Sequence, residues 1–158
     1  MSAVTLDQAN RIIAAVLDRA AETGCRPVSV IVVEPGCKVK AFQKEDGASM
    51  IRFEMAYGKA YAALAMGRSS KLVKVRADEK PIFMRYLLSA SGDQIFPEGG
   101  GLQIRDEVGE VIGAVGVTGD TEDRDEELAV HGIRAIGLKT DADCAEIGRR
   151  GGIRLTNS

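Results

Sequence analysis

The chain has 158 residues, with 21 basic and 23 acidic side chains and a net charge of −2. This balance disfavours a nucleic-acid partner, which needs a basic patch, and the 4% aromatic content disfavours platforms for base stacking. No apolar run reaches the roughly 18 residues of a membrane span, and the first residues lack a secretory signal pattern. The three cysteines lack CxxC spacing, which favours free thiols. We therefore expect one cytoplasmic domain that binds neither nucleic acid nor membranes.

The first half of the chain predicts a helix, a hairpin and a second helix. Thr5 and Gln8 have the spacing of a capping box, and apolar residues recur at helical intervals after it. Residues 28–43 predict a hairpin, because a β-branched run precedes a Pro-Gly turn and an alternating pattern follows it. Helical spacing returns over residues 49–66.

The second half repeats this order. Residues 70–90 predict one or two short helices interrupted near Pro81, and residues 91–101 form a glycine-rich loop. A second hairpin is expected over residues 102–117 and a last helix over residues 121–137. Hairpins separated by helices favour an α/β (α+β) fold with an antiparallel sheet flanked by helices, and disfavour a parallel dinucleotide-binding sheet.

The stretch GAVGVTGDTEDRDEELA at residues 113–129 has the order of elements that cradles phosphates in many nucleotide-binding folds. Its glycines are spaced GxxGxxG, however, and match no phosphate-loop fingerprint. Acidic side chains also crowd the first two turns of the helix that follows, where they would repel an anion. They are Asp120, Glu122, Asp123, Asp125, Glu126 and Glu127. We therefore interpret the glycines as positions where a helix packs closely on a strand.

Three stretches together resemble the GlcG/HbpS-like family, which is described as haem-degrading and DUF336-type. They are GGGLQIRDEVGEVIGAVGVTGDTEDRDEELA (99–129), SVIVVEPGCKVKAFQKEDGA (29–48) and YGKAYAALAMGRSS (57–70). The resemblance implies a profilin-like fold, with a five-stranded antiparallel sheet flanked by helices, usually in homo-oligomers. The family domain is expected over residues 1–138, and residues 139–158 form a C-terminal tail.

The resemblance also implies haem or a related tetrapyrrole as a possible ligand. Family members that bind haem use a His in the first half of the chain, whereas residues 1–130 contain none here. His131 on the last helix is therefore a candidate ligand, beside Tyr57, Tyr61, a Met or a Cys, and a plain helix residue is the alternative. Gln103 also departs from the family, which commonly has Pro there. No set of three or four converging ligands predicts a metal site.

Lys59 lies among small residues, so its ammonium could enter a pocket. It could bind a carboxylate there, or act as a base or Schiff-base amine, and a surface lysine is the alternative. Arg52 lies about two helical turns earlier on the same face. Together the two cations could hold a small anionic ligand, such as a haem propionate or an organic acid.

Further candidates surround this expected pocket. Glu98 and the backbone N–H groups of the following glycines could close it, although a tight connection explains them equally well. Asp125 and Glu126 could face it from the last helix, where helix capping is the alternative role. The glycines are Gly99, Gly100 and Gly101.

Three functions stay open at this point. The first is an oligomeric protein that binds a tetrapyrrole or a similar anionic molecule. The second is a catabolic isomerase, hydratase or lyase for a small carboxylated substrate, with Lys59 and Glu98 or Asp125 in acid–base roles. The third is an accessory protein whose tail docks a partner.

Overall fold

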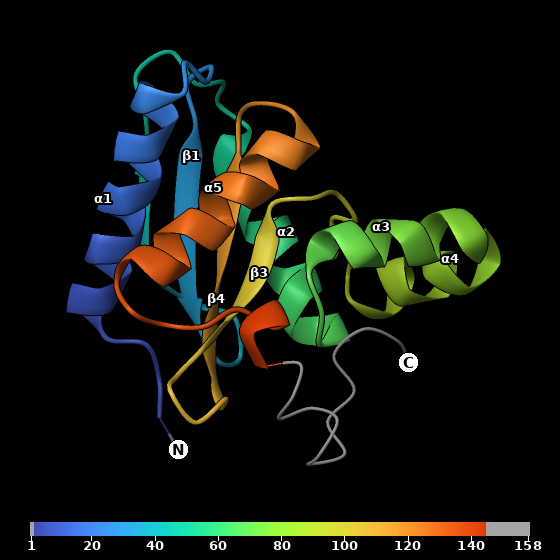
Figure 1. Cartoon of the computed structure of the whole chain (residues 1–158). Coiled ribbons are helices and arrows are strands. Elements are labelled where there is room, and N and C mark those ends of the chain that lie inside the picture. Colours follow the sequence, from blue (N-terminus) through green and yellow to red (C-terminus); the bar gives the residue numbers. More distant parts are fainter. Residues whose placement is uncertain (1, 145–158) are drawn as a thin grey trace.

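The computed structural model describes residues 2–144, which form five α-helices around a four-stranded antiparallel sheet (Figure 1). The helices are α1 (Leu6–Glu22), α2 (Arg52–Met66), α3 (Ser70–Glu79), α4 (Pro81–Ala90) and α5 (Glu122–Ala135). The strands are β1 (Ser29–Glu34), β2 (Lys38–Lys44), β3 (Gly101–Arg105) and β4 (Val111–Thr118). A short 3-10 helix, Ala142–Cys144, ends the described part. No helix within it is long and apolar enough to cross a membrane.

The sheet has the strand order β2-β1-β4-β3, and every neighbouring pair is antiparallel. Both predicted hairpins are therefore confirmed, as is the antiparallel class. The expected count of five strands is wrong for residues 2–144. At the outer edge of β3, where a fifth strand would pair, a single bridge joins Arg105 to Lys139.

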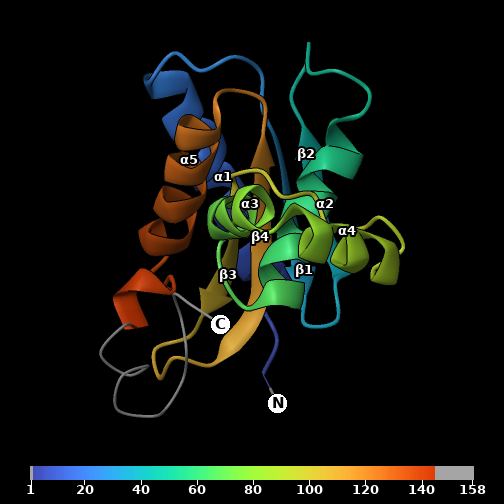
Figure 2. The same cartoon turned by 90° about the vertical axis from the view of Figure 1, so that its right-hand side faces the viewer.

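Helices cover both faces of the sheet. Helices α1 and α5 lie side by side on one face, and α2 lies on the other, with the α3–α4 hairpin projecting beside it (Figures 1 and 2). Strand β1 is buried on both faces: Val30 and Val32 point toward α1, whereas Ile31 and Val33 point toward α2. This explains the continuous apolar run that predicted the strand.

Glycines allow α2 to pack very close to the sheet. A Cβ at Gly116 of β4 would collide with the carbonyl oxygen of Ala56, and one at Gly101 of β3 would collide with that of Lys59. The interpretation of the spaced glycines as helix-packing positions is confirmed for Gly116.

Local signals fix the helix ends. The backbone N–H of Gln8 donates to Oγ1 of Thr5 at 3.1 Å, and that of Thr5 donates to Oε1 of Gln8 at 3.0 Å, which confirms the capping box. Residues 70–90 form two helices, and Pro81 begins the second of them. Proline suits this position because the first turn of a helix leaves its N–H groups without intrahelical acceptors.

The residues from Lys139 to Cys144, here called the C-terminal clip, pack against β3. Nε of Arg105 donates to Oδ1 of Asp141 at 2.7 Å, and the amide of Gln103 donates to the same carboxylate. Arg105 and Gln103 are 5% and 4% exposed, so Asp141 satisfies two buried side chains. The first six residues of the predicted tail thus contact the domain, and the rest of that tail lies outside the described residues.

Candidate functional site

Lys59 is buried in an ion pair. Its Nζ donates to the carbonyl oxygen of Val117 at 3.0 Å and to Oδ2 of Asp125 at 3.1 Å, and the residue is 3% exposed. Burial lowers the pKa of the Lys59 ammonium, while the charge of Asp125 acts in the opposite direction. The hydrogen-bond partners of this ammonium lie on β4 and α5, so the chain itself engages the group that was expected to face a ligand.

Asp125 uses both carboxylate oxygens at the start of α5. Oδ1 accepts the N–H of Asp120 at 3.0 Å, and Oδ2 accepts that of Gly119 at 3.3 Å in addition to the lysine. The N-cap of α5 is Thr121, whose hydroxyl accepts the N–H of Arg124, so Asp125 instead holds the turn before the helix and pairs with Lys59.

Arg52 points to the same end of β4 as Lys59. Its Nη1 donates to Oγ1 of Thr118 at 2.8 Å, and its charge acts on the pKa of Lys59. The structure therefore brings the two predicted cations together, but a strand hydroxyl and a carboxylate of the chain itself engage them.

Glu98 belongs to a neighbouring cluster formed by the loop before β3, α3 and the start of α5, and its charge acts to raise the pKa of Lys59. Lys74 of α3 pairs with Glu98 and with Glu122. Burial and a hydrogen bond to Glu122 raise the pKa of Glu98. Although burial acts to raise it, hydrogen bonds from Glu98, from the Gly99 N–H and from Lys74 lower the pKa of Glu122 to about 2.

The glycine bend does not offer free N–H groups at its two ends. The N–H of Gly99 donates to Oε1 of Glu122, and that of Gly101 donates to Oγ of Ser70, both at 2.7 Å. A Cβ at Gly100 would collide with the carbonyl oxygen of Val117. The N–H groups of Gly99 and Gly101 are therefore not free for an anion, and the bend is a tight connection into β3 that packs closely against Lys59 of α2 and Val117 of β4.

The last two candidates lie on α5. Oε1 of Glu126 is buried without a hydrogen-bond partner among the described residues, and burial raises the pKa of this carboxyl. His131 is half-buried near the other end of α5, on the face of the sheet that α1 also covers. It therefore lies apart from Lys59 and Glu98.

A groove of about 690 Å³ opens on the α2 side of the sheet, between α2, the β1–β2 turn and the loop after α4. It is lined by Gly36, Cys37, Lys38, Val39, Ile51, Phe53, Glu54, Met55, Tyr57, Gly58, Asp93, Gln94, Ile95 and Phe96. Of the haem-ligand candidates considered from the sequence, Tyr57 is among them, and Met55 and Cys37 supply the Met and Cys side chains that were considered beside it. The signal that could have found this groove is the aromatic spacing of Phe53, Tyr57 and Tyr61, which repeats every four residues along α2.

The groove combines aromatic faces with neutral polar groups. The rings of Phe53 and Tyr57 stack with centroids 6.2 Å apart, and the hydroxyl of Tyr57 donates to the carbonyl oxygen of Cys37 at 3.0 Å. Burial raises the pKa of Tyr57 and that of the Cys37 thiol, so both side chains stay protonated at neutral pH. Such a surface suits a flat apolar molecule.

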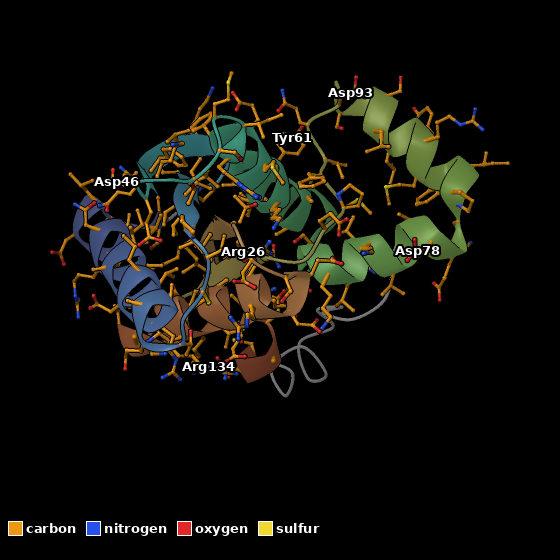
Figure 3. All side chains as sticks on the ribbon, turned by 90° about the horizontal axis from the view of Figure 1, so that it is seen from above. Arg26, Asp46, Tyr61, Asp78, Asp93 and Arg134 are labelled. Carbon is orange, nitrogen blue, oxygen red and sulfur yellow. The ribbon has the colours of Figure 1, made fainter. Side chains whose placement is uncertain are left out.

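Charges of both signs stand along the groove. Lys38 begins β2 at the turn, whereas Glu54 of α2 and Asp93 of the loop carry carboxylates (Figure 3 labels Asp93 beyond the end of α4). A ligand with a carboxylate would therefore direct that group toward Lys38, away from the two acidic side chains.

The family model for "Haem degrading protein HbpS-like" matches residues 4–134 of the chain. A comparison with curated proteins finds no significant match.

Solved structures share the fold. A haem complex of PduOC is 24% identical with a TM-score of 0.78, and the match covers 87% of this chain and 98% of that one. Protein ORFY of Klebsiella pneumoniae, a DUF336 protein, is 27% identical with a TM-score of 0.76, over 84% of this chain and 90% of that one. A double mutant of HbpS from Streptomyces reticuli is 24% identical with a TM-score of 0.75, over 87% and 89%.

Proposed function

The chain belongs to the HbpS-like family of haem-degrading proteins, and from this premise we propose that it is a homo-oligomeric, cytoplasmic protein that binds a flat, carboxylate-bearing small molecule such as haem or a related tetrapyrrole. The groove beside α2 is the observation that carries this proposal. Its volume of about 690 Å³ lies within the range of roughly 300–1,000 Å³ that is usual for small-molecule sites.

The residues that line the groove are better suited to contact the flat ring of such a ligand than to bind its iron tightly. Phe53, Tyr57 and Phe96 supply ring faces, and Ile51 and Ile95 add apolar area. Haem would bring an iron that accepts phenolate or thiolate ligands. Because burial raises the pKa of both Tyr57 and Cys37, ring contacts and Lys38 are expected to supply most of the affinity.

Haem titration, followed by the Soret band, tests the proposal. Val39 lines the groove and is 46% exposed, so Val39→Trp fills the groove without disturbing the core and is expected to weaken binding at least about tenfold. Lys38→Glu removes the cation and is expected to weaken binding of carboxylate-bearing ligands.

Two controls locate the site. Val108 is an exposed apolar residue of the β3–β4 turn, so Val108→Trp should leave the titration unchanged. His131→Ala should also leave it unchanged, because α5 lies across the sheet from the groove. If His131→Ala loses the Soret shift while Val39→Trp binds haem normally, the haem site lies on α5 and the proposal that haem binds in the groove is refuted.

The catalytic alternative rests on the direct contact of Lys59 and Asp125, a base and an acid in one buried pair. Their side chains are 4% and 2% exposed, so a substrate would reach them only after this pair opens. Under this alternative, Lys59→Ala abolishes turnover of a small carboxylated substrate in a protein that remains folded. Unchanged turnover would exclude the mechanism.

A further inference from the structure

Helix α4 is strongly apolar yet poorly covered. Its sequence, PIFMRYLLSA, contains one charged residue, Arg85, and its single buried residue is Met84. Ile82 is 75% exposed, Tyr86 is 71% exposed and Phe83 is 45% exposed. A helix that is apolar around most of its circumference is normally buried on several sides, so this surface indicates an interaction site.

The exposed residues form one continuous stripe. Ile82, Phe83, Tyr86 and Ala90 are spaced i, i+1, i+4 and i+8, which places them on a single helix face, and half-buried Leu87, which packs on the core beneath α4, borders this face. We call this face the α4 stripe. It lies on the hairpin that projects from the body, where a second molecule can reach it without meeting the sheet (Figures 1 and 2).

We propose that the α4 stripe binds the α4 stripe of a second copy of this chain, with the two helices antiparallel about a two-fold axis. The stripe is tapered, because bulky Ile82 and Phe83 stand at its start and small Ala90 and Ser91 stand at its end. An antiparallel pair sets the bulky end of each helix against the small end of the other. In this register Phe83 faces Ala90 of the second copy, and Tyr86 faces its Leu87.

The same register is favourable for the charges at the two ends of α4. Lys80 directly precedes the helix and Asp93 follows it by three residues, and both are exposed. When Phe83 faces Ala90 of the second copy, Lys80 comes close to the loop that follows α4 of that copy, where Asp93 carries a carboxylate, and the two-fold axis repeats this arrangement. Size and charge therefore both favour the antiparallel arrangement, which favours self-association over an unrelated partner.

This inference specifies the surface behind the oligomeric part of the proposed function. A contact between two ten-residue helices is small beside the roughly 800 Å² per partner of a standard interface, so the dimer should depend on concentration. Sedimentation equilibrium of the full chain over a concentration series is expected to show a monomer–dimer step at this surface.

Substitutions on the stripe test the contact. Tyr86→Glu and Ile82→Glu place charges at exposed positions, and each is expected to weaken dimerisation by roughly thirtyfold or more while the circular dichroism spectrum stays the same. Val108→Glu is the matched control, because Val108 is 67% exposed and lies on the β3–β4 turn, and it should leave the dimer intact. A parent chain that is monomeric throughout, or stripe variants that assemble like the parent, would overturn the proposal.

A charge exchange tests the register. Lys80→Glu alone sets two acidic pairs at the interface, and Asp93→Lys alone sets two basic pairs, so each variant should dimerise roughly tenfold more weakly. A mixture of the two variants forms opposite-charge pairs at both ends and should recover the affinity of the parent. If the mixture does not recover the dimerisation affinity of the parent, this alignment is excluded. If the stripe binds a different protein instead of a second copy, the mixture likewise does not recover that affinity.

Haem titration separates this inference from the proposed function. Ile82 and Tyr86 do not line the groove, so the monomeric Tyr86→Glu variant should still bind haem if the groove is the site. A parent that dimerises but does not bind haem would refute the groove alone. A parent that binds haem but never dimerises would refute the stripe alone.

Discussion

The ammonium of Lys59 lies 3.1 Å from Oδ2 of Asp125, and this buried pair joins α2 to α5 past the end of β4. The same carboxylate accepts the N–H groups of Gly119 and Asp120, which form the turn between β4 and α5. One acidic side chain thus fixes a helix on each face of the sheet relative to the strand between them.

We predict that Asp125→Ala lowers the free energy of unfolding by about 3–5 kcal/mol, because it leaves a buried ammonium and two backbone donors without their acceptor. Urea unfolding followed by circular dichroism measures the change. Asp123→Ala on the same helix is the control: Asp123 forms an exposed pair with Lys71, so its removal should change stability little. Equal effects of the two substitutions would contradict a special role for Asp125.

We predict that Gly116→Ala destabilises the protein by about 1–3 kcal/mol or more, because the added methyl group forces α2 away from β4. The measurement is again urea unfolding. Gly24→Ala has open space around its Cβ but a left-handed φ of 67°, so it should cost only about 1 kcal/mol. If Gly116→Ala lowers the free energy of unfolding no more than Gly24→Ala does, the close approach of α2 to β4 does not require a glycine at position 116.

The elements of this fold were predictable because each has a local signal. The capping box at Thr5, the Pro-Gly turn of the first hairpin and Pro81 between α3 and α4 act within a few residues, so the sequence displays them directly. The prediction of a fifth strand was wrong for a different reason. The edge of β3 is covered by the C-terminal clip, whose contacts with Arg105 join positions 36 residues apart.

The groove was not predictable in the same way. Its walls come from three segments, and their meeting depends on the strand order, which no local pattern specifies. Lys59 and Asp125 were both singled out, Lys59 for a pocket or a surface position and Asp125 for the pocket or for helix capping, but not as partners of each other. Only the position of β4 between α2 and α5 shows that the two side chains neutralise each other.

We predict that Glu122 makes the stability depend on acid pH. Its pKa falls from the ordinary 4.5 to about 2 in the folded chain, so its contribution is complete above pH 4.5 and is lost as the pH falls toward 2. Glu122→Gln removes this titration, and the stability difference between parent and variant should shrink over that range. Glu127→Gln, at an exposed position of α5, is the control. A difference that stays constant with pH would contradict the predicted role of Glu122.

We predict that the C-terminal clip is part of the folded domain, so that ending the chain at residue 138 is harmful whereas ending it at residue 144 is not. Truncation at 138 removes Asp141 and leaves Arg105 buried without its carboxylate, which should cost about 3 kcal/mol or more. Asp141→Ala in the full chain should reproduce most of this loss in urea unfolding. Lys139→Ala removes a side chain that donates to the exposed carbonyl of Glu107 and should have little effect. If the 138-residue chain were as stable as the 144-residue chain, the domain would end where the sequence resemblance ends, and the Arg105–Asp141 pair would be incidental.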